Sequence, residues 1–183
     1  MNMQSNIYDA GKVLLSAEDI DGIVHRLGER ISADYAGKAP VLVNLLKGGV
    51  VFLSDLIRCV TIPLEIDFLS VSSYGNDTSS SGVIRIVQDL STNIMGRHVL
   101  VVEDIIDSGH TLAYIFNMLK LRSPRSLEAC SLLRKPEALT RGISMKYVGR
   151  DIPDVFVVGY GLDYQEKFRN LPYIAMLLPE NNL

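Results

Sequence analysis

The stretch VVEDIIDSGHT, Val101–Thr111, decides the fold of this chain and carries most of its chemistry. It opens with an apolar run from Leu100 to Val102, which is typical of a parallel strand buried on both faces. The adjacent carboxylates Glu103 and Asp104 follow, and Asp107 comes next. Open α/β sheets bind ligands at the ends of such strands. We therefore predict an α/β fold with a ligand site where this strand ends.

The turn Ser108–Thr111 opens a helical run, so unpaired backbone N–H groups and the positive end of the helix dipole point at one spot. An anion such as phosphate fits there, and acids beside an anion-binding loop indicate a sugar phosphate. The alternative is an ordinary strand–loop–helix joint with solvated acids. Clustered carboxylates repel each other, however, and usually persist for a ligand or a metal.

Composition places the chain among ordinary globular proteins, with 183 residues, 48% hydrophobic and 21% charged. This length predicts one domain over residues 1–183. The net charge of −3 and the lack of a basic run argue against a nucleic-acid partner. No apolar run is long enough for a membrane span, and the polar N-terminus lacks a signal-peptide core. We expect a cytoplasmic protein whose two cysteines are reduced.

Strands and helices alternate through the middle of the chain, which predicts a parallel sheet with helices on both faces. Hydrophobic periodicity and turn residues predict helices over residues 17–36, 50–59 and 110–121. Strands are predicted over residues 41–46, 64–71, 83–88, 98–102, 127–133, 147–148, 155–158 and 174–178.

The segment from about residue 72 to residue 83 is polar and has almost no apolar content beyond Tyr74. Such a segment cannot bury enough surface to hold itself in place, and long mobile loops in compact domains often act as lids. A β-hairpin tip is the alternative.

The acid–acid–x–x–Asp–Ser–Gly–x–Thr string resembles the phosphoribosyl diphosphate (PRPP) motif of type I phosphoribosyltransferases. Further segments resemble the 6-oxopurine branch of that family, in its bacterial type: Leu46–Gly49, Ser73-Tyr74, Lys135, and Phe156–Tyr164 followed by Arg169. The resemblance covers roughly residues 40–179. It implies the type I phosphoribosyltransferase fold, a central mostly parallel sheet flanked by helices, with a small hood built from N- and C-terminal segments.

The resemblance implies a purine-salvage enzyme that joins hypoxanthine or guanine to PRPP, giving IMP or GMP and pyrophosphate. Ser108, Gly109, His110 and Thr111 are then expected at the 5′-phosphate. Asp107 becomes the candidate general base or acid for the purine ring proton. The alternative role for Asp107 is to cap the following helix.

Carboxylates are expected to hold both the sugar and a metal. Glu103 and Asp104 suit the ribose hydroxyls, because charge-assisted hydrogen bonds are roughly twice as strong as neutral ones. Both are also candidates for binding Mg²⁺ together with Asp163, since Mg²⁺ prefers a few carboxylates plus substrate oxygens. We therefore expect a Mg²⁺-dependent reaction.

The remaining site residues follow from the resemblance. Lys135 is expected to donate to the purine O6, Phe156 to stack on the base, and Val157 and Asp163 to contact its edge. Pyrophosphate is expected at Lys47, Gly48 and Arg169, with a cis peptide between Leu46 and Lys47, and a lid carrying Ser73 and Tyr74 is expected to close over the site.

Three other functions compete with this one. A xanthine or adenine phosphoribosyltransferase differs only in the base, and Lys135 argues against adenine. A regulator that binds RNA or DNA and senses nucleotides would need a basic face, which this chain lacks. A sugar-phosphate-binding protein without transfer activity would not need Asp107, Lys135 and Arg169 together. By resemblance to small enzymes of the family we expect a homodimer or homotetramer.

Overall fold

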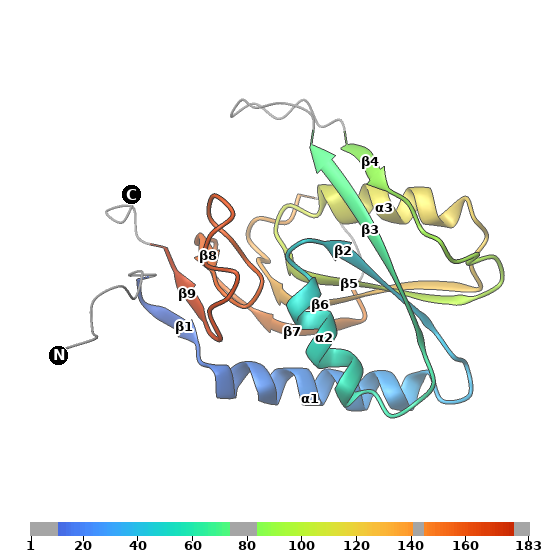
Figure 1. Ribbon diagram of the computed structural model, residues 1–183, viewed down its shortest axis with the longest axis horizontal. Helices are drawn as coiled ribbons and strands as arrows, with labels where there is room; N and C mark the ends of the chain where they lie inside the picture. The colour runs from blue at the N-terminus through green and yellow to red at the C-terminus, as the bar shows by residue number, and fades with distance from the viewer. Residues whose placement is uncertain (1–10, 74–83, 141–144, 178–183) are drawn as a thin grey trace.

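A six-stranded sheet forms the body of the computed structural model, which describes residues 11–73, 84–140 and 145–177 (Figure 1). The strands run in the order β4 (Ile84–Gln88), β3 (Glu65–Ser73), β2 (Val41–Leu46), β5 (His98–Ile106), β6 (Ser126–Arg134) and β7 (Tyr147–Asp151). All neighbours are parallel except β3 and β4, which are antiparallel. The predicted mostly parallel sheet is confirmed.

Helices cover both faces of this sheet. On one face lie α1 (Ala17–Asp34) and α2 (Val50–Cys59), and on the other lies α3 (His110–Lys120) (Figure 1). Alternate residues of the central strands serve the two faces: Leu100 belongs to the core under α1 and α2, whereas Val101 packs in the core under α3. This double burial explains why the strand reads as a continuous apolar run.

The first helix begins as its sequence indicates. Ser16 caps it: its Oγ accepts a hydrogen bond from the Asp19 backbone N–H at 3.1 Å, and the Asp19 carboxylate accepts from the Ser16 N–H at 3.0 Å. This reciprocal capping box pairs two backbone donors that helix formation would otherwise leave unpaired. The helix ends at Asp34, two residues short of the predicted boundary at residue 36.

The direction in which the chain adds strands to the sheet reverses between β2 and β5. After β2 the chain returns as β3 on one side, and after β5 it returns as β6 on the other. In open α/β sheets this switch point marks the crevice that binds ligands. The β2–β5 pairing ends early, at Asn44 opposite Val102, so the two strands separate toward their carboxyl ends.

A second, three-stranded antiparallel sheet forms a hood beside the main sheet (Figure 1). It combines β1 (Val13–Leu15) from the N-terminal part of the chain with β8 (Val157–Val158) and β9 (Ile174–Met176) from the C-terminal part. The predicted hood of N- and C-terminal segments is confirmed. The strand β1 was not predicted, because three residues are too short to show a period.

Most predicted boundaries differ from the structure by one to four residues, and two of these differences bear on the site. The strand predicted to end at residue 102 continues to Ile106, so Glu103 and Asp104 lie within β5 rather than after it. They remain in the strand because β6 keeps pairing with β5 as far as Ile106. Of the predicted lid, β3 includes Ser73, while Tyr74 lies outside the described residues. Among the described helices none is both long and apolar enough to cross a membrane.

Candidate active site

Two adjoining hollows open at the carboxyl ends of β2 and β5. The first, of about 260 Å³, is lined by Glu103 and by Ser108 and Thr111 from the turn before α3. The second, of about 360 Å³, has the following among its lining residues: Lys47, Lys135, Phe156, Val157, Asp163 and Arg169. Both hollows share Gly48, Asp104, Ile105 and Asp107. The structure thus gathers most of the predicted site residues from distant segments at the carboxyl ends of the central strands, although Gly109 and His110 line neither hollow.

The turn before α3 is shaped to receive an anion. Gly109 occupies the N-cap position in a left-handed conformation, with φ of 80°, which favours glycine. The helix has no side-chain cap, so the idea that Asp107 caps it is wrong. The N–H groups of the first turn therefore remain available for phosphate oxygens. His110 can contribute only its backbone here, because its ring contacts Thr140 Oγ1 at 3.1 Å and does not line the hollow.

Glu103 and Asp104 are buried acids. Their exposed fractions are 7% and 9%, and the Gly48 backbone lies directly against the Asp104 carboxylate. Burial, and then the neighbouring Asp104, raise the pKa of Glu103 well above its usual value. Burial also raises the pKa of Asp104. Two acids held in so unfavourable a place indicate that hydroxyl groups or a cation normally accompany them.

The acids that were assigned to a metal fall into two groups. Asp104 and Asp163 both line the second hollow, whereas Glu103 lines only the first. Within the described part of the chain, no group of three acids, histidines or cysteines is close enough to hold an ion alone. Mg²⁺ commonly uses one or two carboxylates and takes its other ligands from water and substrate phosphates. Asp104 and Asp163 therefore fit Mg²⁺ that arrives with a diphosphate.

Lys135 lies between two carboxylates. Its side chain is 8% exposed, and its Nζ lies 2.8 Å from Asp107 Oδ2 and 3.2 Å from Asp154 Oδ1. Burial lowers the pKa of Lys135, but the pairs with Asp107 and Asp154 outweigh burial and raise it. The ammonium is therefore charged and points into the second hollow beside Asp107. Sequence reasoning missed Asp154, because no local pattern links it to a lysine 19 positions earlier.

Phe156 and Val157 form one wall of the second hollow. Phe156 is 53% exposed, and its ring meets that of Tyr164 edge-to-face, with 5.8 Å between ring centroids. A backbone hydrogen bond from Leu177 to the Phe156 carbonyl holds it beside the hood, and Val157 is buried within β8. An aromatic face left open to a hollow suits stacking with a planar base.

The loop after β2 meets the C-terminal segment at the far side of this hollow. The Leu46–Lys47 peptide is cis, as the resemblance implied. Lys47 Nζ lies 3.0 Å from Glu166 Oε2, and Arg169 Nη2 reaches the same oxygen at 3.3 Å and Asp163 at 2.8 Å. Two cations thus share one exposed glutamate where pyrophosphate is expected. Sequence reasoning also missed Glu166.

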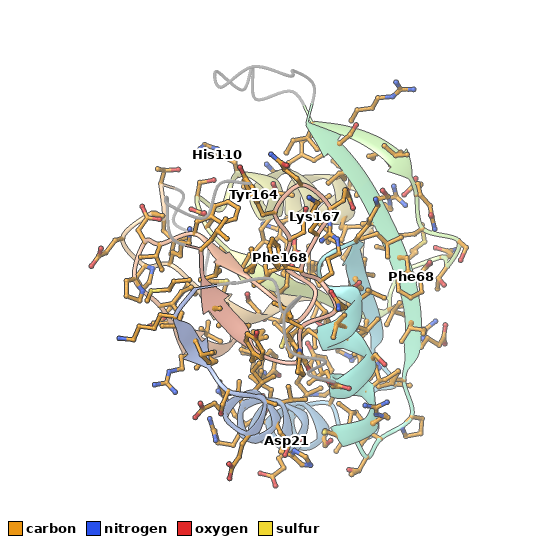
Figure 2. All side chains as sticks on the ribbon, turned by 60° about the vertical axis from the view of Figure 1, so that its left-hand side comes forward. Asp21, Phe68, His110, Tyr164, Lys167 and Phe168 are labelled. Carbon is orange, nitrogen blue, oxygen red and sulfur yellow. The ribbon has the colours of Figure 1, made fainter. Side chains whose placement is uncertain are left out.

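A hollow larger than either of these lies elsewhere. It measures about 690 Å³ and is bounded by α1, α2 and residues 169–172. Asp21 on α1 lines it, and Figure 2 shows Asp21 at the opposite end of the molecule from His110 and Tyr164. Because this hollow lacks both the turn before α3 and the acids of β5, size does not identify the site. The site is identified instead by the convergence of anion-binding and acidic groups.

Comparisons with known proteins agree with this geometry. Residues 12–165 match the family model described as the phosphoribosyl transferase domain. The chain is 50% identical over 177 residues to a hypoxanthine-guanine phosphoribosyltransferase of Mycobacterium tuberculosis, covering 93% of this chain and 88% of the relative. It is 46% identical to the Bacillus subtilis protein of the same name, covering 94% and 96%. A hypoxanthine phosphoribosyltransferase structure from Staphylococcus aureus superposes with a TM-score of 0.93 at 47% identity, covering 100% of both chains.

Proposed function

Because the chain belongs to the phosphoribosyltransferase family and its relatives are hypoxanthine-guanine phosphoribosyltransferases, we propose that it transfers the phosphoribosyl group of PRPP to hypoxanthine or guanine. The products are IMP or GMP and pyrophosphate, and the reaction serves purine salvage. The observation that carries the proposal is the place of Asp107, which lines both hollows and pairs with Lys135. One carboxylate thus faces both substrates.

Each hollow suits one part of the reaction. The first takes the 5′-phosphate at the N-terminus of α3 and the ribose hydroxyls at Glu103 and Asp104. The second takes the base between Phe156 and Lys135. The bond between C1′ and the diphosphate oxygen breaks, and a bond from C1′ to a purine ring nitrogen forms. The ring proton passes to Asp107, while Lys47, the Gly48 backbone and Arg169 receive the leaving pyrophosphate.

Mg²⁺ held by Asp104 and Asp163 would neutralise charge on the leaving diphosphate. Residues of the chain itself provide the other contacts to the leaving group. Arg169 is prepared for phosphate oxygens, because its Nη1 donates to the Gly161 carbonyl at 2.8 Å and its Nη2 pairs with acids, which fixes the guanidinium plane. When pyrophosphate binds, it replaces Glu166 as the partner of Lys47 and Arg169.

The charge on Lys135 supports a 6-oxopurine. An ammonium donates hydrogen bonds to a 6-oxo group but faces only donors on the 6-amino group of adenine, and a site built this way rejects the wrong base strongly. Xanthine differs at position 2 and remains the alternative substrate. The names of the relatives and the net charge of −3 do not favour a nucleic-acid regulator.

We further propose a cytoplasmic homodimer or homotetramer. The two free cysteines, of which Cys130 is fully buried, support a reducing compartment. The oligomeric state rests on resemblance to small enzymes of the family. Sedimentation of the purified protein tests it, and a monomer at all concentrations would contradict it.

The direct test is a spectrophotometric assay with PRPP and Mg²⁺, run separately with hypoxanthine, guanine, xanthine and adenine. We expect nucleotide from hypoxanthine and guanine and none from adenine. Turnover with xanthine alone would replace the proposed substrates. Binding of PRPP without turnover of any base would overturn the proposed reaction and move the protein to the sensor class.

A further inference from the structure

The two carboxylates that hold Lys135 differ in what they face. Asp107 lines both hollows and lies where a substrate proton has to be handled. Asp154 lines neither hollow. It sits in the turn between β7 and β8, closed by a hydrogen bond from the Val155 N–H to the Pro153 carbonyl, and its side chain is 57% exposed. Asp154 therefore contacts the ammonium of Lys135 from outside the substrate space.

A bound base changes the surroundings of this ammonium. When the purine proton engages Asp107, that carboxylate has to share or give up its contact with Lys135. A buried ammonium that loses its partner favours the neutral amine, because burial disfavours the charged form. Asp154 is the second carboxylate at 3.2 Å, and no substrate group competes for it.

Resting on the proposed function, we propose that Asp154 is a specificity-determining positioning residue, which keeps Lys135 charged and fixed so that the enzyme accepts 6-oxopurines and rejects 6-aminopurines. The distinction between 6-oxopurines and 6-aminopurines depends on whether the Lys135 side chain is a protonated ammonium or a neutral amine. An ammonium has only donors, whereas a neutral amine has a lone pair that accepts a hydrogen bond from the 6-amino group of adenine. Loss of Asp154 thus weakens binding of the 6-oxo group and removes the penalty against the 6-amino group.

The charges around Lys135 give this proposal a pH signature. Asp107 and Asp154 contact the ammonium directly, while Asp104, Asp163, Lys47 and Arg169 line the same hollow. The ion pairs with Asp107 and Asp154 hold the pKa of Lys135 above its usual value against the effect of burial. Without Asp154, only Asp107 opposes the effect of burial on Lys135, so the pKa of Lys135 falls. Activity with hypoxanthine is then lost at a lower pH than in the parent enzyme.

Asp154→Asn removes the charge while keeping the shape of the side chain. We expect kcat/KM for hypoxanthine to fall roughly 10- to 100-fold, mostly through KM for the base, because one partner of a buried charge is lost. The ratio of hypoxanthine to adenine turnover should fall with it. Measured from about pH 6 to about pH 10, the descending limb of the profile should move to lower pH.

The chain offers a matched control three residues away. Asp151 pairs with Arg134 at 2.6 Å, so Asp151→Asn removes the same charge from the same region without contacting Lys135. We expect its base preference and pH profile to match the parent enzyme. Asp154→Glu should keep the carboxylate and recover most of the discrimination, which a role in folding alone would not predict.

The outcomes separate two failures. If the parent enzyme shows no turnover with hypoxanthine or guanine, the proposed function fails. If the parent enzyme works and Asp154→Asn behaves like Asp151→Asn in base ratio and pH profile, the role of Asp154 is overturned. The same conclusion follows if Asp154→Glu discriminates no better than Asp154→Asn. Circular dichroism and a melting curve of each variant verify that the compared proteins are folded.

Discussion

The two sides of β5 behave differently. Toward β6 the pairing continues to Ile106 opposite Arg134, at the carboxyl end of both strands. Toward β2 it stops at Asn44 opposite Val102. One side therefore holds the strand in place, while the other opens the crevice that Glu103 and Asp104 line. A parallel sheet can build a site by ending one ladder early, provided that the other ladder continues.

Asn44 marks the point where the open side begins. This residue is fully buried, and its Nδ2 donates to the Val102 carbonyl at 3.0 Å, at the last paired position. A Cβ on Gly49 would lie 2.4 Å from the same nitrogen, so the amide and the loop after β2 fit closely. Within the described structure, Asn44 Oδ1 has no hydrogen-bond partner. A polar side chain thus ends the ladder in the middle of an apolar sheet.

The largest expected effect is a loss of turnover at Asp107, which lies directly after β5 and lines both hollows. Asp107→Asn should keep PRPP binding but lower kcat by about 10²- to 10⁴-fold, because the amide cannot take the purine proton. Steady-state kinetics with hypoxanthine, together with PRPP titration, measure both quantities. An unchanged kcat would remove Asp107 from proton transfer.

The closed side should respond in stability rather than in chemistry. Leu132 is fully buried in β6, so Leu132→Ala should lower the free energy of unfolding by about 2–5 kcal/mol through lost burial and a cavity. KM for PRPP should stay near the parent value at temperatures where the variant is folded. Urea unfolding and kinetics at low temperature test this contrast, and a large change in KM with little loss of stability would break it.

A methyl group on the loop after β2 should partly close the crevice. In Gly48→Ala the new Cβ would lie 2.0 Å from Asp104 Oδ2, so this buried carboxylate has to move. We expect KM for PRPP to rise on the order of 10- to 100-fold, with a smaller effect on KM for the base. Gly22→Ala on α1 serves as the control, since its new Cβ would meet only the Arg26 side chain at 3.4 Å. Equal kinetics in both variants would contradict the role of the close approach.

The smallest effect should be a gain in stability. The pKa of Glu103 is raised in the folded state above the usual value of 4.5, so the folded protein holds a proton that the unfolded chain releases. Stability therefore falls as pH rises above about 4.5. Glu103→Gln removes this loss, and we expect it to be more stable by about 1–2 kcal/mol near pH 8, with lower activity. Unfolding at pH 8 and near pH 4.5 measures the difference, which should shrink at the lower pH.

The sequence was sufficient for the elements whose residues lie close together in the chain. The apolar run at Val101, the turn at Gly109 and the helix after it were placed correctly, because local spacing encodes them. The hood and the cis peptide after Leu46 came only from the resemblance to a family, since no local pattern specifies them. Local pattern also ended β5 too early, because Glu103 and Asp104 read as a polar loop.

The missing parts of the site were long-range contacts. Asp154 reaches Lys135 from the turn between β7 and β8, and Glu166 reaches Lys47 across 119 positions. Asn44 lies within the strand predicted over residues 41–46, and only the register of β2 against β5 shows what it does. Such contacts depend on topology, which spacing along one chain does not encode.

The division of the site into two hollows also bears on how such enzymes diversify. In the proposed reaction, sugar-phosphate recognition is concentrated in one contiguous stretch around Ser108, whereas the base would meet Lys135, directly after β6, and Phe156 and Val157, at the start of β8. An altered base preference can therefore arise by exchanging side chains in one compartment while the reactive sugar is still held as before. For an engineer, the second hollow is the place to install new nucleobases, and the four shared residues are the ones to leave alone.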